Sequence, residues 1–125
     1  MRWPIIAPSV PPTTAPIAIA AAEITREKLF LACHQEIPYS TAVITDHWAE
    51  EDGRIVIHQS IILERDSQKG VVIGKGGAML KKIGSQARAE IIEMVGDKVH
   101  LDIRVKVDRD WTNKPRANRL LKAED

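Results

Sequence analysis

The chain has little of what several classes of function require. Its 125 residues include one cysteine, Cys33, so an internal disulfide is excluded and a reducing cytoplasmic setting is expected, with an organelle matrix as the alternative. The four histidines show none of the spacings that hold a metal ion. No nucleophile stands beside a base in a recognisable pattern, and Glu50-Glu51-Asp52 is interpreted as a charged hairpin loop. The sequence therefore predicts a protein that is not an enzyme and has no metal site or cofactor.

Long apolar runs are also missing. The longest, near Ile17 to Ala22, is far shorter than the ~20 residues that a membrane-spanning helix needs. The prolines around it argue against a secretory signal peptide. The net charge of +1 neither supports nor opposes nucleic-acid binding, because only the local placement of charge matters. A chain of this length and composition is expected to form one soluble domain.

The first twenty residues differ in composition from the rest. They hold five of the seven prolines and one charged residue, Arg2. Because proline interrupts regular helix, we expect residues 1–20 to be a disordered or loosely attached Pro/Ala-rich extension. A mitochondrial presequence is a weaker interpretation, since such segments are rich in arginine. Residues 112–125 are expected to form a charged C-terminal tail, which leaves a domain at 21–111.

Hydrophobic periodicity predicts an α+β fold for this domain. Apolar residues recur every four positions from Ala78 to Val95 and indicate a helix that Gly96 ends. Strict alternation over 99–108 predicts a strand with one buried face, and Asp52-Gly53 is a hairpin signal. The expected elements are a helix at 21–36, strands at 40–49 and 54–64, a short helix at 67–73, a helix at 78–95 and a strand at 99–108. A three-stranded sheet with helices packed on one face accounts for all the apolar faces.

The segment GVVIGKGGAMLKKIG, residues 70–84, contains a glycine turn that resembles two phosphate-binding devices. One is the nucleotide-binding P-loop, which needs four residues between its first glycine and a Gly-Lys-Ser/Thr sequence. Here three residues separate Gly70 from Gly74, and Gly76 follows Lys75, so the hydroxyl that would bind Mg²⁺ is missing. Both the spacing and the chemistry argue against a nucleotide site.

The other device, a Gly-x-x-Gly clamp for a single-stranded nucleic-acid backbone, fits better. Gly74 and Gly77 bracket the two central residues, and glycine lets a sugar–phosphate backbone approach closely. The helix expected directly after the loop would offer its free N–H groups to phosphate. Because Gly-x-x-Gly also occurs as a plain tight turn, the surrounding elements carry much of this interpretation.

The blocks around the loop resemble the C-terminal RNA-binding domain of the Era GTPase family, a type II KH domain with the order α-β-β-α-α-β. These blocks are AAEITREKLFLACHQEIPYS, ILERDSQKGVVIGKGGAMLKKIGSQARAEIIEM and KVHLDIRVKVDRDW. They come in the family's order and at its spacing, and they cover residues 21–111. The family's GTP-binding domain, with its true P-loop, has no counterpart in them. GTP hydrolysis therefore cannot be carried over onto any residue of this chain.

The resemblance implies a single-stranded RNA partner, in particular the 3′ end of small-subunit (16S-type) ribosomal RNA during assembly of the 30S subunit. We expect a monomer with no small-molecule substrate, and membrane association is implied by the resemblance alone. Two other functions stay open. One is that of a C-terminal fragment of a full Era-type protein that couples GTP hydrolysis to ribosome biogenesis, and the other is that of a KH-shaped domain that binds proteins.

The candidate RNA-binding residues fall into three groups. The loop and the lysines near it are expected to contact phosphates, with a solvated helix face as the alternative for the two lysines on the helix. The apolar residues before the loop, together with the preceding strand, are expected to be groove wall or core, with core favoured for one of Val72 and Ile73. Two basic residues on the polar face of the last strand either reach RNA or face solvent. The full set is Gly74, Lys75, Gly76, Gly77, Ile73, Val72, Lys81, Lys82, Arg104 and Lys106.

Overall fold

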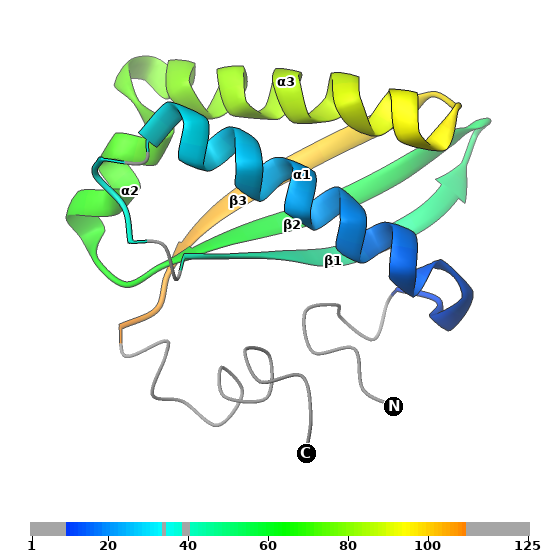
Figure 1. The fold of residues 1–125 in the computed structure, drawn as a ribbon, viewed down its shortest axis with the longest axis horizontal. Coiled ribbons are helices and arrows are strands. Elements are labelled where there is room, and N and C mark those ends of the chain that lie inside the picture. The colour runs from blue at the N-terminus through cyan, green and yellow to red at the C-terminus, as the bar shows by residue number, and fades with distance from the viewer. Residues whose placement is uncertain (1–9, 34, 39–40, 110–125) are drawn as a thin grey trace.

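Helices lie across one face of a three-stranded sheet (Figure 1). The computed structural model describes residues 10–33, 35–38 and 41–109. Its elements are a 3₁₀ turn at Pro12–Thr14, α1 at Ala15–Cys33, β1 at Ala42–Glu51, β2 at Arg54–Leu63, α2 at Asp66–Ile73, a 3₁₀ turn at Lys75–Gly77, α3 at Ala78–Val95 and β3 at Val99–Val107. The expected α-β-β-α-α-β order is confirmed. The predictions for residues 1–9 and for the tail at 112–125 lie outside the described residues.

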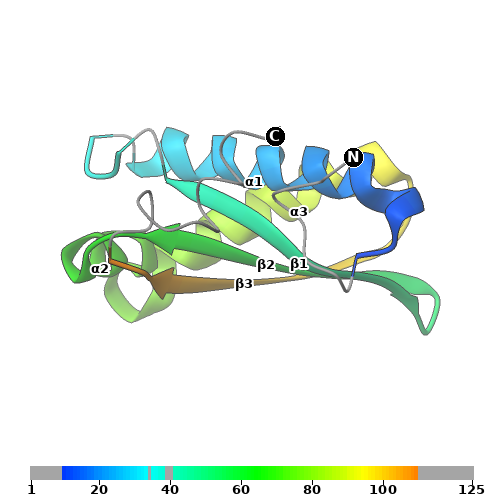
Figure 2. The same ribbon diagram turned by 90° about the horizontal axis from the view of Figure 1, so that it is seen from below.

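The sheet is mixed, with strand order β1-β2-β3. β1 and β2 form an antiparallel hairpin, and Asp52 and Gly53 at its turn both have positive φ, 54° and 77°. β3 pairs in parallel with the other side of β2. Because parallel strands need a crossover connection, α2, the glycine turn and α3 together form one (Figures 1 and 2). The crossover places α3 against β3.

Helix α1 starts earlier than expected. The prediction of a disordered extension over residues 1–20 is wrong for its second half, because Val10, Ala15 and Ala18 are each at most 4% exposed. Pro16 lies in the first turn of α1, where N–H groups have no intrahelical acceptor and a proline is tolerated. The alanines, which look featureless in the sequence, are the small side chains that let α1 approach the sheet.

The other boundaries follow the predictions closely. α3 spans the expected residues, and Gly96 after it is left-handed (φ 71°) and donates its N–H to the carbonyl of Ile92 at 2.8 Å. α1 ends at Cys33 instead of residue 36, where the following proline had suggested the stop. β3 shows the expected alternation, but Val99 is its one buried residue, because β3 is an edge strand and its apolar face is only half covered.

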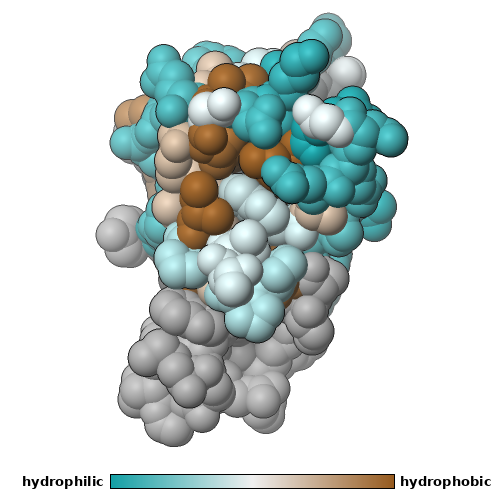
Figure 3. Space-filling model, turned by 90° about the vertical axis from the view of Figure 1, so that its right-hand side faces the viewer, coloured by the Kyte–Doolittle hydropathy of each residue, from teal (hydrophilic) through white to brown (hydrophobic). Residues whose placement is uncertain are grey.

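Buried aliphatic side chains fill the space between the helices and the sheet. Leu29 of α1, Ile57 and Ile61 of β2 and Ile83 of α3 are each 0% exposed, and burying such a side chain contributes about 1.5–3 kcal/mol. Figure 3, which views the right-hand side of Figure 1, shows apolar atoms reaching the surface among hydrophilic ones. Cys33 belongs to the core, and burial raises the pKa of its thiol.

A buried polar ladder fixes α1 on the sheet. Thr25 Oγ1 donates to Gln59 Oε1 at 2.6 Å, and Gln59 Nε2 donates to Thr45 Oγ1 at 3.4 Å. Thr45 Oγ1 in turn donates to the carbonyl of Ala18 at 2.9 Å. All three side chains are 0% exposed. Since buried polar groups are costly when unpaired, the ladder sets the register of α1 against β1 and β2.

Replacing Gln59 by leucine is expected to lower the free energy of unfolding by about 1–3 kcal/mol, because Thr25 loses its buried acceptor while the packed volume is nearly kept. Urea unfolding of both proteins measures the difference. The double variant Gln59→Leu/Thr25→Val removes both partners and should recover part of the loss. Equal stability of Gln59→Leu and the natural sequence would contradict the role of the ladder.

Candidate nucleic-acid interface

Three of the four positions in the loop between α2 and α3 have backbone angles that glycine adopts far more easily than other residues. Gly74 has φ 75° and ψ 176°, Gly76 has φ 62°, and Gly77 has φ 81°. Gly74 ends α2 by donating its N–H to the carbonyl of Gly70 at 2.9 Å, and Gly77 closes the turn by donating to the carbonyl of Gly74 at 3.2 Å. The chain thus reverses within a few residues and enters α3 directly.

The three glycines have different spatial surroundings. A Cβ atom at Gly74 would lie 2.6 Å from the Cβ of Met79 and 2.8 Å from its backbone nitrogen, so glycine there is required by packing. A Cβ atom at Gly76 or Gly77 would meet nothing within 4 Å. Gly74 therefore holds the loop against α3, whereas the other two present bare backbone to an open surface.

The electrostatics of the loop favour an anion. No side chain caps the N-terminus of α3, where the amide groups carry partial positive charge. The side chain of Lys75 is exposed. In the part of the chain that the structure describes, no ion pair occupies Lys75, Lys81 or Arg88. These cations are thus available to an RNA ligand, whose phosphates and base edges both accept hydrogen bonds from them.

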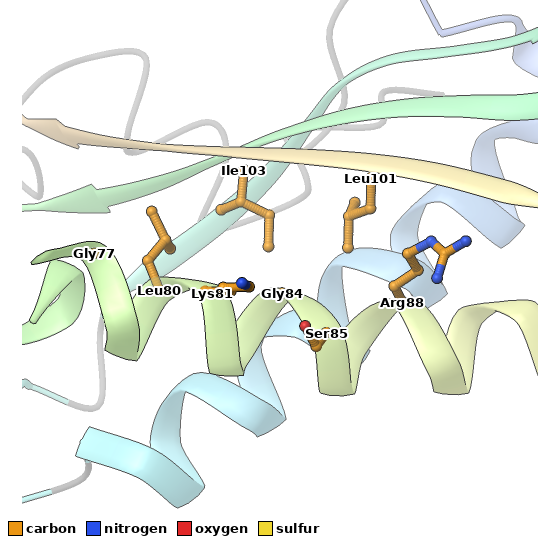
Figure 4. A pocket seen from close by; sticks show the side chains of 8 residues that line it. All are labelled: Gly77, Leu80, Lys81, Gly84, Ser85, Arg88, Leu101 and Ile103. Carbon is orange, nitrogen blue, oxygen red and sulfur yellow. The ribbon is translucent and has the colours of Figure 1, made fainter.

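A groove leads away from the loop between α3 and β3 (Figure 4). Its cavity has a volume of about 360 Å³. Leu101 and Ile103 of β3 are half-buried and form its apolar wall opposite α3. The complete lining is Gly77, Leu80, Lys81, Gly84, Ser85, Arg88, Leu101 and Ile103. A groove with apolar walls that opens beside an anion-binding loop can take unstacked bases while the loop holds their backbone.

The wall of this groove is not the one predicted from the sequence. The residues before the loop and the preceding strand, β2, do not line it. Val72 is 0% exposed and packs in the core, whereas Ile73 is half-buried outside the groove. The reason is the parallel pairing of β3 beside β2, which puts β3 at the sheet edge next to α3. Of the two residues, Val72 is the one that belongs to the core.

The basic candidates separate into different surfaces. Lys81 lines the groove. Lys82 lies on the α1 side. Its positive charge there lowers the pKa of the Cys33 thiol and so offsets part of the rise that burial causes. Arg104 and Lys106 alternate along β3 with the groove wall, so they lie on the face of the sheet away from α3. Nε of Arg104 is 3.8 Å from the carboxylate of Asp102. The structure therefore does not bring Lys82, Arg104 or Lys106 to the groove.

Arg88 is not among the candidates that the sequence provided. It lines the end of the groove opposite the loop, and its Nε donates to the carbonyl of Val99 at 2.7 Å. Spacing offers a signal in retrospect. Lys81 and Ser85 are four residues apart on α3, and Gly84 and Arg88 are four apart on the adjoining row, so all four share one face of the helix, in line with Gly77 at its N-cap.

Features of other functional classes are absent from the described ranges. Across residues 10–33, 35–38 and 41–109, no three or more His, Cys, Asp and Glu side chains gather as a metal site would require. None of the helices in these ranges is long and apolar enough to cross a bilayer.

A mixed three-stranded sheet, helices on one face and a glycine turn inside the α-α connection define the type II KH class of fold. A family model described as KH domain matches residues 36–112, which is more than half of the chain. The chain belongs to the KH domain family.

Within that family the chain is similar to GTPase Era. It is 53% identical over 102 residues to GTPase Era of Bradyrhizobium sp. (strain BTAi1), a match that covers 81% of this chain and 33% of that protein. Identity to GTPase Era of Afipia carboxidovorans is 46% over 122 residues, covering 97% and 40%. The chain therefore spans about a third of the length of these curated relatives. The resemblance to Era is confirmed, and it concerns the KH portion.

A solved structure agrees in fold. The crystal structure of Era in complex with MgGDPNP and nucleotides 1506–1542 of 16S ribosomal RNA matches with a TM-score of 0.79 and 39% identity. The match covers 84% of this chain and 36% of that one. It confirms the expected α+β KH fold. The GTPase portion of the relatives lies outside the match, and the one Gly-Lys pair in this chain is Gly74-Lys75 of the loop.

Proposed function

We propose that this chain binds single-stranded RNA, with the backbone on the GKGG loop and the bases in the groove between α3 and β3. The RNA is the 3′ end of small-subunit ribosomal RNA, and the role is in assembly of the 30S subunit. One observation carries the proposal: an open glycine backbone, an uncapped helix N-terminus and an apolar groove flanked by free cations meet at one place. The 16S RNA bound by the solved Era relative supports the choice of RNA.

The arrangement assigns a separate task to each part. Phosphates lie against Gly76 and Gly77, where no side chain intervenes, and Lys75 and Lys81 supply the opposite charge. Bases leave the stack and contact Leu101 and Ile103. Such contacts favour a single strand, because a duplex keeps its bases stacked and paired away from a groove wall.

A second candidate function rests on the names of the relatives, which are GTPases. In it, the chain acts as the RNA-binding part of an Era-type protein that couples GTP hydrolysis to ribosome biogenesis. Gly70–Gly77 does not match the P-loop of such an enzyme, so no GTP hydrolysis is assigned to these residues. RNA binding by this chain can therefore be tested without GTP. We further propose a cytoplasmic monomer, which gel filtration with light scattering tests.

Fluorescence anisotropy tests the RNA-binding function directly. A labelled single-stranded RNA that copies the small-subunit rRNA 3′ end is expected to bind more tightly than a scrambled RNA and than the same sequence in a duplex. If Lys75 and Lys81 each meet one phosphate, log K falls with log salt concentration with a slope of about −1.4. Addition of GTP is expected to change nothing.

Two results would contradict the proposal. One is no binding of any RNA by a protein whose circular dichroism shows it folded. The other is equal affinity for the three RNAs with the same salt slope, because that is non-specific attraction of a polyanion. Either result would favour the alternative of a KH-shaped domain that binds proteins.

A further inference from the structure

Arg88 lies at the end of the groove farthest from the glycine loop. Figure 4 shows its side chain rising from α3 toward β3 beside Leu101, while Gly77 marks the opposite end. Its Nε donates to the carbonyl of Val99 at 2.7 Å. This hydrogen bond holds the side chain between α3 and β3, although Arg88 itself is exposed.

The hydrogen bond to Val99 determines which N–H groups of Arg88 can still bind a ligand. Once Nε is used, the two terminal nitrogens remain, and they form a planar fork with parallel N–H groups. No ion pair with a described carboxylate occupies this fork. A preorganised fork without a protein acceptor suits a ligand group with two adjacent acceptors.

The length of the groove indicates which part of the ligand Arg88 meets. From Gly77 to Arg88 the chain advances eleven positions along α3, which is about 16 Å at 1.5 Å per residue. A KH loop clamps about four nucleotides. Since the loop is expected to hold the backbone and the groove beyond it is walled by Leu101 and Ile103, we expect the group that reaches Arg88 to be a base.

We propose that Arg88 reads the identity of the base at this far end of the groove and selects guanine or cytosine there. Guanine offers O6 and N7 side by side, and cytosine offers O2 and N3, so either accepts both N–H groups of the fork. Adenine and uracil alternate donors with acceptors along their edges and leave one N–H unpaired. This inference rests on the proposed RNA binding and adds to it a residue that determines sequence preference.

The test is a base-by-base scan. The RNA that binds the natural protein best is remade with each of the four bases at each position, and anisotropy is measured for every version. One position is expected to prefer guanine or cytosine over adenine and uracil by roughly 5- to 100-fold.

Arg88→Lys keeps the charge but not the fork, so it should abolish this preference while leaving the other positions unchanged. Arg88→Gln should also abolish the preference, because it removes the fork as well. Arg54→Gln, which removes an exposed cation at the hairpin turn, is the matched control and should change no preference.

The outcomes separate this inference from the proposed function. If the natural protein binds no RNA, the proposed function fails and the inference fails with it. If it binds RNA but Arg88→Lys keeps the full preference at every position, RNA binding stands and the assignment of Arg88 is wrong. A uniform loss of affinity for all four bases at all positions would identify Arg88 as a phosphate contact and would also overturn the assignment.

Discussion

Replacing Lys75 and Gly76 together by aspartate is expected to weaken RNA binding at least about 100-fold. The change removes the exposed cation of the loop and puts two carboxylates where phosphate would lie. Like charges at such distances repel by up to a few kcal/mol near a protein surface, and a loss of about 2.7 kcal/mol is already 100-fold. Anisotropy with the small-subunit rRNA 3′ end measures the effect.

The matched control is the double variant Lys75→Asn/Gly76→Asn. Asparagine has the shape of aspartate without its charge, and both tolerate the left-handed φ of 62° at position 76. A Cβ atom there meets nothing within 4 Å, so neither variant should unfold the domain. The asparagine variant is expected to lose affinity far less than the aspartate variant. If the two lose affinity equally, the loop acts through its shape alone and the phosphate site is wrongly placed.

The second large effect is on stability. Gly74→Ala is expected to lower the free energy of unfolding by about 2–4 kcal/mol. Its φ of 75° with ψ of 176° belongs to a region that glycine alone occupies readily, which costs about 1–3 kcal/mol for another residue. The new methyl group would also lie 2.6 Å from the Cβ of Met79, so α3 must shift. Thermal and urea unfolding measure the loss.

Gly76→Ala is the comparison for this prediction. It has a positive φ as well, but its Cβ meets nothing within 4 Å, so only the backbone cost of about 1–2 kcal/mol applies. Gly74→Ala should therefore be clearly the less stable of the two. Equal stability of the two variants would mean that the contact with Met79 relaxes freely and does not fix the loop.

Local sequence signals predicted those elements whose causes are local. The four-residue apolar period and Gly96 fixed the limits of α3, and Asp52-Gly53 marked the hairpin. The start of α1 was missed because prolines and alanines suggest a loosely attached extension when their neighbours in space are unknown. A proline in the first helical turn breaks no hydrogen bond, and an alanine signals burial only once a sheet lies beside it.

The loop was predictable and the groove was not, for the same kind of reason. Gly74 to Gly77 form a contiguous motif, whereas the groove combines α3 with β3 across a parallel pairing that no local pattern specifies. Arg104 and Arg88 show the consequence. Both are exposed arginines, but strand alternation turns the first away from the groove while the helical repeat turns the second toward it.

The parallel pairing of β2 with β3 also determines when the site comes into existence during folding. The β1–β2 hairpin closes through neighbours in sequence, but β3 joins only after the whole segment from Glu64 to Lys98 has been laid across the sheet. Contacts that close long loops form late, because the entropy of closure is lost before they stabilise anything. One wall of the groove is therefore among the last parts to assemble. We therefore expect a chain that is still emerging from the ribosome to have the glycine loop before it has the groove, and to bind bases only after β3 has paired with β2.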